Sequence, residues 1–408
     1  MKGPRKASSP SVAGREHSMN RINFIIFFSI FLLVYGLINY YVFFRGLHAI
    51  PAGSPIRTVY MIAFWVVSWS FIAGRFLERA AITPFSTAVV WVGSFWFAAF
   101  AYFTLAALFI DMLRLVNYVI PFFPAFVTGN IARTKAVLAI GVASVVVIAL
   151  VIGYFNAKNP RLKTLDIHIP KSADSLKTLN VAVASDIHLG TIIGNGRLKT
   201  IVDTINSLHA DLVLFPGDIV DEDLAPVIKQ NLGETLRTIK AKYGVFAITG
   251  NHEYIGGVEE AYKYLTDHGI RVLRDEVITV DGNITLVGRE DRSISQFAGK
   301  KRKPLPELMA TVDRRFPIIM MDHQPIGLNE AVDAGVDLQL SGHTHHGQIW
   351  PFGWITEAIY EVSWGYTKKN QTHFYVSSGV GTWGPPVRLG NTPEIINLRI
   401  TFGSTGPS

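Results

Sequence analysis

Apolar residues dominate the first 156 positions of the chain, and a charged pattern punctuated by glycine follows them. Four apolar stretches in the first part reach, or nearly reach, the roughly 20 helical residues that cross a hydrocarbon core. The pattern therefore predicts an α-helical membrane domain over residues 22–156, after a basic cytoplasmic tail over residues 1–21. The four stretches cover residues 22–44, 58–74, 85–110 and 136–155.

The first stretch and the region after the third allow more than one interpretation. A cleavable signal peptide does not fit the first stretch, because its apolar core is too long and no small-residue cleavage site follows. The region 112–127 is apolar but interrupted, which predicts an interfacial or re-entrant segment rather than a fifth span. The interrupting residues are Arg114, Asn117, Pro121 and Pro124.

Basic residues flank both ends of the apolar part, and the intervening loops carry fewer of them. Under the positive-inside rule, four spans place both ends in the cytoplasm, whereas a fifth span would place the second half outside. We therefore expect a multi-pass protein of the cell (inner) membrane whose second half is cytoplasmic. The flanking residues are Lys2, Arg5, Lys6, Arg15 and Arg21 before the first span, and Lys158, Arg161, Lys163, Lys171 and Lys177 after the last.

From residue 179 onward, short apolar runs of strand length alternate with stretches of helical periodicity, as in an α/β domain. Polar clusters follow the carboxyl end of each predicted strand, which is where ligands bind in open α/β sheets. The predicted strands are 179–184, 211–215, 244–248, 318–321 and 338–340, and the predicted helices include 197–208 and 258–268.

The composition narrows the possible partners. A length of 408 residues suggests two structural units, in agreement with the change of pattern. The chain contains no cysteine, which excludes disulfides and thiolate metal sites. The formal net charge of +7 does not by itself indicate nucleic acid, because part of the excess flanks apolar spans, where anionic lipid headgroups are the simpler partner. We therefore predict a lipid bilayer as partner, no nucleic acid, and no particular protein partner.

Five short polar motifs follow the predicted strands in fixed order. They supply carboxylates, imidazoles and an amide oxygen, which are ligand types for divalent metals. Taken singly, each has a structural explanation, because an aspartate at a strand end often caps a helix; turn and capping roles explain Asp322 and Glu253 equally well. Together they indicate two metal ions that share one carboxylate, a site that clamps phosphate esters. The motifs are 186–188 (D-I-H), 217–221 (G-D-I-V-D), 250–253 (G-N-H-E), 322–325 (D-H-Q-P) and 342–345 (G-H-T-H).

This ordered set resembles the signature of the calcineurin-like metallophosphoesterase superfamily, D-x-H, G-D-x-x-D, G-N-H-E, H and G-H-x-H. The resemblance covers the chain from about residue 179 to the C-terminus. It implies a metallophosphoesterase domain over residues 157–408, folded as a two-sheet α/β/β/α sandwich. The tail over residues 375–394 is similar to the membrane-linked bacterial branch, which includes phosphodiesterases similar to the UDP-2,3-diacylglucosamine hydrolases.

The resemblance also implies a role for each motif residue. Two divalent ions (Mn, Fe or Zn) would share the carboxylate of Asp218, and solvent between them would be acidified and attack phosphorus in line. His252 would stabilise the transition-state charge or protonate the leaving oxygen, and Asp221 would orient a ligand histidine. The first ion would have the ligands Asp186, His188, Asp218 and His345, and the second Asp218, Asn251, His323 and His343.

Residues outside the motifs bear on the substrate. Arg388, in the glycine-rich terminal loop, is either a contact for a substrate phosphate or a plain surface arginine. His346 stands where this branch more often has glycine, and it is a substrate contact, a spare ligand or an exposed loop histidine. Four tryptophans near the C-terminal end either form an apolar entrance for acyl chains or pack the core. They are Trp350, Trp354, Trp364 and Trp383.

We therefore expect a membrane-anchored hydrolase that uses a metal-bound hydroxide to cleave a phosphodiester or pyrophosphate bond in a lipid-linked or nucleotide-sugar substrate. The alternative is a non-catalytic metal-binding scaffold or a regulatory module of a membrane bundle, although such scaffolds typically lose ligands and none is missing here. A phosphomonoesterase also remains open, because loops around the metals, not the ligands, decide between monoesters and diesters.

Overall fold

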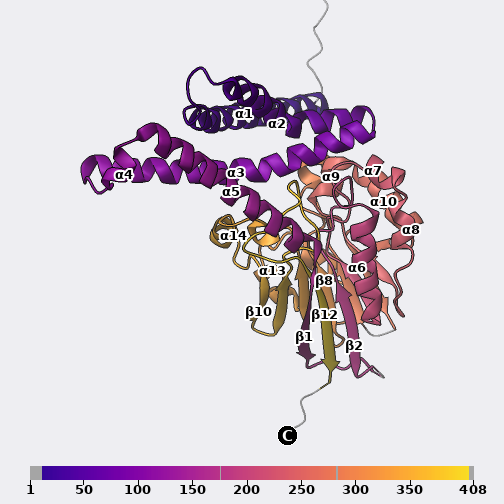
Figure 1. The fold of residues 1–408 in the computed structure, drawn as a ribbon. Coiled ribbons are helices and arrows are strands. Elements are labelled where there is room, and N and C mark those ends of the chain that lie inside the picture. Colours follow the sequence, from indigo (N-terminus) through magenta and orange to yellow (C-terminus); the bar gives the residue numbers. More distant parts are fainter. Residues whose placement is uncertain (1–11, 175, 282–283, 404–408) are drawn as a thin grey trace, which may run out of the picture. The chain divides into compact units, whose positions relative to one another are not determined.

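The computed structural model describes residues 12–174, 176–281 and 284–403 (Figure 1). The chain divides into two compact units, Met1–Ser68 with Phe100–Ser144, and Trp69–Ala99 with Val145–Ser408. Residues 1–11 of the predicted basic tail, with Lys2, Arg5 and Lys6, lie outside the described residues. Helix α1 begins inside that predicted tail, at Val12.

Four of the described helices are long and apolar enough to cross a membrane, as the hydrophobic pattern predicts. The apolar part of the first is Phe28–Leu47, and the other three are α2, α3 and α5. Many of their large apolar side chains are exposed, which suits lipid as the surrounding solvent. The helices of this part of the chain are α1 (Val12–Leu47), α2 (Pro55–Ala80), α3 (Pro84–Val119), α4 (Ala125–Thr128) and α5 (Ile131–Lys158).

The region 112–127 is divided between two helices and the loop that joins them, so it is not one segment as expected, and its interfacial position stays a prediction. Residues 112–119 continue α3, and a loop with the short helix α4 follows. Arg114 is compatible with this helix and pairs with Asp111 one turn earlier, at 3.2 Å. The helix ends shortly before Pro121, because proline lacks a backbone donor and excludes the helical conformation from the residue before it.

In the second unit, the end of α2 and the start of α3 cross closely. A Cβ added at Gly93 would lie 2.4 Å from the Cα of Phe71, and one added at Gly74 would lie 3.0 Å from the Cα of Val90. Small residues let helix backbones approach in a membrane, where packing rather than hydrophobicity drives association. The rings of Phe71 and Phe97 stack with their centroids 4.5 Å apart. The two helix ends therefore form a tightly packed hairpin.

Two six-stranded sheets make up most of the second unit. The first has the order β1-β12-β2-β3-β4-β5, and the second has the order β10-β11-β9-β8-β7-β6. The strands of the first sheet are β1 (Arg161–Ile169), β12 (Glu394–Phe402), β2 (Thr178–Val183), β3 (Leu212–Phe215), β4 (Val245–Ala247) and β5 (Arg271–Val272). Those of the second are β10 (Gly365–Lys369), β11 (Thr372–Val376), β9 (Leu338–Ser341), β8 (Ile318–Met321), β7 (Ile284–Gly288) and β6 (Glu276–Val280).

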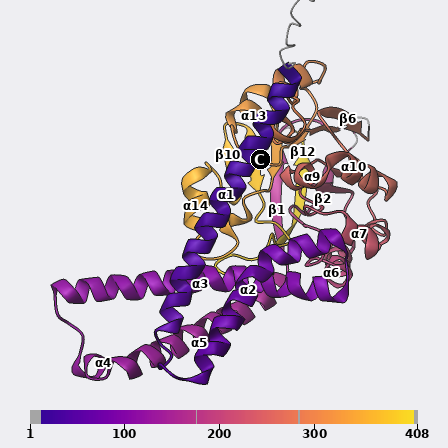
Figure 2. The same ribbon diagram turned by 90° about the horizontal axis from the view of Figure 1, so that it is seen from above.

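The two sheets share an apolar core, and helices cover their outer faces. Leu214 and Phe215 are neighbours in β3 and point to opposite faces, as successive strand residues do. Leu214 joins the core between the sheets with Leu286 of β7, and Phe215 joins the core under α6 and α10. Val287 of β7 packs under α12 and α13 on the second sheet. Figures 1 and 2 both show α6 and α10 on one flank and α13 on the other. The covering helices are α6 (Asn195–Ser207), α10 (Val258–Asp267), α12 (Leu305–Leu308) and α13 (Asn329–Ala334).

This α/β/β/α arrangement confirms the expected fold class. The predicted strands appear as β2, β3, β4, β8 and β9, and the predicted helices appear as α6 and α10. The prediction lacked β1, which begins just after Asn159 and Pro160 and pairs in parallel with β12. The last membrane helix therefore runs almost directly into the first sheet.

Candidate metal centre

Every predicted ligand lies in a loop after a parallel strand, or at the start of the helix that follows it. The loops after β2, β3 and β4 belong to the first sheet, and those after β8 and β9 belong to the second. The carboxyl ends of parallel strands meet at one edge of a sheet, so these loops converge. The first sheet supplies Asp186, His188, Asp218 and, at the start of α9 (Asn251–Gly256), Asn251; the second supplies His323, His343 and His345.

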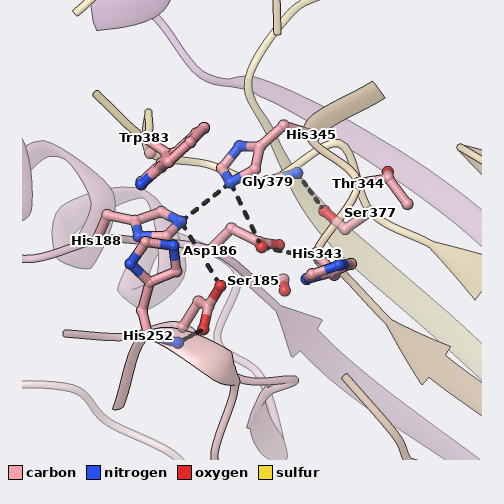
Figure 3. A network of polar contacts seen from close by, with 12 residues as sticks. Ser185, Asp186, His188, His252, His343, Thr344, His345, Ser377, Gly379 and Trp383 are labelled. Carbon is pink, nitrogen blue, oxygen red and sulfur yellow. Dashed lines mark hydrogen bonds and ion pairs between the residues drawn. The ribbon is translucent and has the colours of Figure 1, made fainter. Parts of the chain in front are cut away.

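Asp186, His188 and His345 form a first group, with one ligand atom of each within 4.8 Å of the others. The Nε2 atoms of His188 and His345 face each other at 3.0 Å, and His345 Nε2 lies 3.6 Å from Asp186 Oδ1. All three side chains are buried. Figure 3 shows them pointing toward one another. The donors predicted around the first ion are therefore close together.

Asp218, His323 and His343 form a second group within the same 4.8 Å limit. His323 Nε2 lies 3.0 Å from Asp218 Oδ2. The amide oxygen of Asn251 lies 2.7 Å from His343 Nδ1 and 3.3 Å from His323 Nε2. The four donors predicted around the second ion therefore also meet.

Asp218 stands between the two groups. Its Oδ2 lies 3.0 Å from His323 Nε2 and 3.8 Å from His188 Nε2. Its Oδ1 accepts a hydrogen bond of 2.9 Å from the backbone N–H of His252, which fixes the orientation of the carboxylate. This is where a carboxylate shared by two cations would have to lie.

The polar atoms of the first group are arranged to bind a cation, because they do not satisfy one another as hydrogen-bond donors and acceptors. Asp186 Oδ2 is buried and has no hydrogen-bond partner. Two imidazole nitrogens 3.0 Å apart can share only one proton between them, so neither has a donor to spare for Asp186. Buried acceptors without donors are costly. Carboxylates, neutral imidazoles and an amide oxygen suit Mn, Fe or Zn, so the residues present fit divalent metal ions.

The backbone of the ligand loops is strained. For residues that carry a Cβ, a left-handed conformation is uncommon and costs of the order of 1–3 kcal/mol each. Such strain persists only where the surrounding structure imposes it, and it often marks functional sites. The φ angles are 54° at Asp186 and His188, 53° at Asp218, 73° at His343 and 46° at His345.

The pKa shifts of Asp218 and His345 suit metal binding. The pKa of His323 does not: burial would lower it, but Asp218 raises it well above its ordinary value, so a cation bound there would displace a proton. Burial alone would raise the pKa of Asp218, but the nearby histidines, His323 first, hold that pKa well below its ordinary range. Burial, followed by the neighbouring His188 and Arg388, lowers the pKa of His345 well below its ordinary value. An ionised carboxylate and a neutral imidazole are the forms that bind cations.

Glu253 does more than cap a helix, which is the role expected from sequence, because it also connects two ligand loops. Its buried carboxylate accepts backbone hydrogen bonds from Gly250 (2.7 Å), Val220 (2.9 Å) and Asp218 (3.2 Å). It therefore ties the loop after β3 to the start of α9. The signal for its capping part is the glutamate three residues after Gly250, at the N3 position of the helix.

Asp221 lies beside two histidines. Its Oδ1 is 3.2 Å from His252 Nδ1 and 3.6 Å from His188 Nδ1. A carboxylate at Nδ1 favours the proton on that nitrogen and leaves Nε2 free. Burial alone would lower the pKa of His252, but Asp218 and Asp221 raise that pKa to about 9. The ring of His252 lies edge-on to those of His188 and Trp383, with centroids 4.5 and 5.8 Å apart.

Arg388 is fully buried behind His345. Its Nη2 donates hydrogen bonds of 2.7 and 2.8 Å to the carbonyls of Ser378 and Gly381, and it lies 3.2 Å from His345 Nδ1. These backbone contacts occupy the guanidinium. The position favours a role in holding His345 over contact with a substrate phosphate.

His346 lies apart from the two ligand groups. Its Nδ1 is 3.1 Å from the hydroxyl of Ser363, and its ring is tilted against Trp364 with the centroids 5.3 Å apart. Its Nε2 lies 3.7 Å from Glu357. These partners are on the segment that follows the last motif, so the structure does not bring His346 to the predicted ligands.

Comparison with known proteins identifies the family of the segment that carries the motifs. A family model for calcineurin-like phosphoesterases matches residues 179–347. An "uncharacterized metallophosphoesterase" of Helicobacter pylori (strain J99) is 32% identical over 252 residues, which cover 60% of this chain and 65% of that protein. A protein of the same name from Aquifex aeolicus is 31% identical over 234 residues, which cover 57% of this chain and 87% of that protein. A "transmembrane protein with metallophosphoesterase domain" from Danio rerio is 31% identical over 288 residues, which cover 67% of this chain and 64% of that protein.

The matched region contains every predicted ligand, from Asp186 to His345. The match spans slightly less than two thirds of the Helicobacter and Danio relatives, so the likeness concerns part of those proteins. It spans most of the Aquifex protein. On these grounds the chain belongs to the calcineurin-like metallophosphoesterase family.

Proposed function

We propose that this protein is a metal-dependent phosphoesterase that cleaves a phosphodiester or pyrophosphate bond. The observation that carries the proposal is the position of Asp218, whose Oδ2 lies 3.0 Å from His323 Nε2 in one ligand group and 3.8 Å from His188 Nε2 in the other. A carboxylate within reach of two ligand groups suits two ions that act together on one phosphate.

Seven side chains would hold two Mn, Fe or Zn ions. When bound there, the ions supply Lewis acidity toward phosphate oxygens and offset the charge that develops during displacement. The chain itself fixes the donors in place, through strained loops and through Glu253. The first ion would contact Asp186, His188, Asp218 and His345, and the second would contact Asp218, Asn251, His323 and His343.

His252 is the residue that we assign to proton transfer. Asp221 lies at its Nδ1, at 3.2 Å, which leaves Nε2 for the substrate. Although burial opposes it, Asp218 and Asp221 raise the pKa of His252 to about 9, and Asp221 remains beside its Nδ1 when Asp218 binds metal. A protonated His252 can hydrogen-bond to a phosphate oxygen and donate a proton to the leaving oxygen.

An apolar rim supports a substrate with a lipid part. Trp383 lies edge-on to His252 and is 46% exposed. Figure 3 shows its indole beside the imidazoles of His188 and His345. An exposed indole next to polar ligands offers an apolar surface to a substrate whose phosphate is at the metal centre. We therefore propose a phosphorylated lipid or an acylated nucleotide-sugar as the substrate.

The segment that faces a second exposed tryptophan is attached to a membrane helix. Trp350, which is exposed, donates its backbone N–H to the carbonyl of Leu389 at 2.7 Å. The neighbouring residue Arg388 donates its backbone N–H to the carbonyl of Gly153 in α5, at 3.0 Å. The segment of Arg388 and Leu389 is thus fixed to the last turns of a helix that is apolar enough to span a bilayer. This attachment supports a substrate that lies in the bilayer.

We further propose that the protein lies in the cell membrane, with the domain over residues 157–408 in the cytoplasm. The basic residues after the last span support this orientation. Four candidate spans among the described residues are consistent with both ends on one side.

The test is hydrolysis of an aryl phosphodiester by full-length protein purified in detergent with Mn²⁺. We expect turnover that a chelator abolishes and that Mn²⁺ restores. Asp218→Asn should lower kcat by at least about 100-fold, because it removes the shared negative charge. Stoichiometric metal without hydrolysis of any phosphoester would reject the proposal and favour a non-catalytic scaffold.

A further inference from the structure

The C-terminal end of α2 brings a cation close to the metal ligands. Arg75 and Asp221 belong to the same compact unit. Arg75 Nη1 lies 3.6 Å from Asp221 Oδ2, and the Arg75 side chain is only 26% exposed. Because α2 is a candidate membrane span, this ion pair joins a membrane helix to the loop that follows β3.

Further polar contacts fix the end of α2 on the sheet domain. Glu78 is buried, lies 3.7 Å from Arg75 and accepts a hydrogen bond from the hydroxyl of Thr191, in the loop after β2. Lys229 donates a hydrogen bond to the carbonyl of Ile82, just beyond α2. A buried carboxylate is costly unless it is paired, so Glu78 favours one arrangement of this helix end. The position of Arg75 is therefore well determined.

The two oxygens of Asp221 face different partners. Oδ2 faces Arg75, whereas Oδ1 lies 3.2 Å from His252 Nδ1 and 3.6 Å from His188 Nδ1. Any shift of the carboxylate on its Arg75 side therefore changes its distance from both imidazoles. Carboxylates behind ligand histidines fix the tautomer and the ring orientation, and their loss typically weakens metal binding 10–100-fold.

We propose that Arg75 is a positioning residue of the metal centre, acting through Asp221 on His188 and His252. The membrane helix α2 is then part of the support of the site as well as an anchor. This inference rests on the proposed function for its activity readout, whereas its metal-binding readout needs no substrate.

The test compares variants of the full-length protein in detergent by calorimetric titration with Mn²⁺ and by hydrolysis of an aryl phosphodiester. We expect Arg75→Gln to weaken Mn²⁺ binding about 10-fold and to lower kcat while KM changes little. Arg75→Lys keeps the charge without the planar guanidinium and should recover part of the affinity. Arg79→Gln alters an exposed arginine one turn later on α2 and should match the parent protein.

A double-mutant cycle separates positioning from a general loss of structure. If Arg75 acts through Asp221, Arg75→Gln reduces Mn²⁺ affinity much less in an Asp221→Asn background than in the parent protein. Equal losses in the two backgrounds, or unchanged affinity in Arg75→Gln, overturn the inference. Should melting curves show that Arg75→Gln does not fold, the same cycle is run with Arg75→Lys. Metal binding by the parent protein without hydrolysis would reject the proposed function alone, because the cycle on affinity would still decide the role of Arg75.

Discussion

At the scale of single residues, the centre depends on a close approach between loops of opposite sheets. A Cβ added at Gly342 would lie 1.9 Å from Ser185 Oγ and 2.2 Å from Asp186 Oδ2. The backbone N–H of the next residue, His343, donates a 2.8 Å hydrogen bond to Asp186 Oδ1. Gly342 cannot carry a side chain, because the carboxylate of the ligand Asp186 occupies the position that its Cβ would take.

Gly342→Ala should displace Asp186 and strongly reduce metal binding. We also expect a loss of stability of about 1–3 kcal/mol, because the added methyl group overpacks a buried site. Gly196→Ala is the matched control, since a Cβ at Gly196 in α6 meets nothing within 4 Å. The control should bind metal normally and be neutral or slightly stabilised. Mn²⁺ content and thermal melting measure both effects, and equal Mn²⁺ content in the two variants would contradict the close approach.

The identities of the candidate ligands could be predicted from sequence, because the motifs keep donor types at fixed spacing after apolar runs. The places of Arg388 and Arg75 could not. Arg388 is buried only because the carbonyls of Ser378 and Gly381 surround it, and no local pattern encodes that loop closure. An arginine near the end of an apolar span, such as Arg75, looks like a headgroup contact until the fold brings it to Asp221.

At the scale of elements, buried strands end in short strained loops that hold the candidate ligands. β3 and β9 are buried throughout, whereas the loops that follow them hold ligands in left-handed conformations. Without a cation, buried acceptors such as Asp186 Oδ2 have no partner, so no favourable contact compensates for the strained backbone. Metal binding should therefore stabilise the loops more than the strands.

Removal of metal with a chelator should raise amide hydrogen exchange in the ligand loops over residues 185–190, 217–221 and 342–347. Exchange in β3 and β9 should stay slow, because opening of the loops does not require opening of the sheets. Re-addition of Mn²⁺ at 100 times its Kd should restore protection and add about 2.7 kcal/mol per bound ion to the free energy of unfolding. Mass spectrometry of peptides measures the pattern, and an equal rise in loops and strands would indicate global unfolding instead.

The strands that sequence predicted are mostly buried apolar runs, but not every buried strand was predicted, because β7 and β11 are also buried throughout and lie inside the second sheet. The edge strand β1 was missed as well. β1 carries Lys163 and Asp166, is mostly open to solvent over its first half, and pairs with β12 from the far end of the chain. Its second half, from Leu165 to Ile169, alternates apolar and polar residues as a half-buried strand does, so this part of the strand carried a local signal. The alternation does not indicate the partner strand, because β12 comes from the far end of the chain.

At the scale of the whole molecule, hydropathy predicted a division near residue 156, whereas the compact units group the end of α2, the start of α3 and the end of α5 with the sheets. Polar contacts account for this difference. Asn156 donates hydrogen bonds of 3.0 and 2.8 Å to the carbonyls of Arg388 and Asn391, and Arg75 pairs with Asp221. A hydropathy window averages such residues away, so it detects the spans but not their attachment to the sheet domain.

The lack of cysteine allows the sidedness of the whole molecule to be measured with introduced thiols. Ala52→Cys, in the loop between α1 and α2, and Lys199→Cys, on α6, replace exposed residues. With four spans and a cytoplasmic N-terminus, these positions lie on opposite sides of the bilayer. A membrane-impermeant maleimide should therefore label Ala52→Cys in intact cells and should label Lys199→Cys only after permeabilisation. Labelling of both in intact cells would place the sheet domain outside, and the substrate would then have to be sought among external lipids.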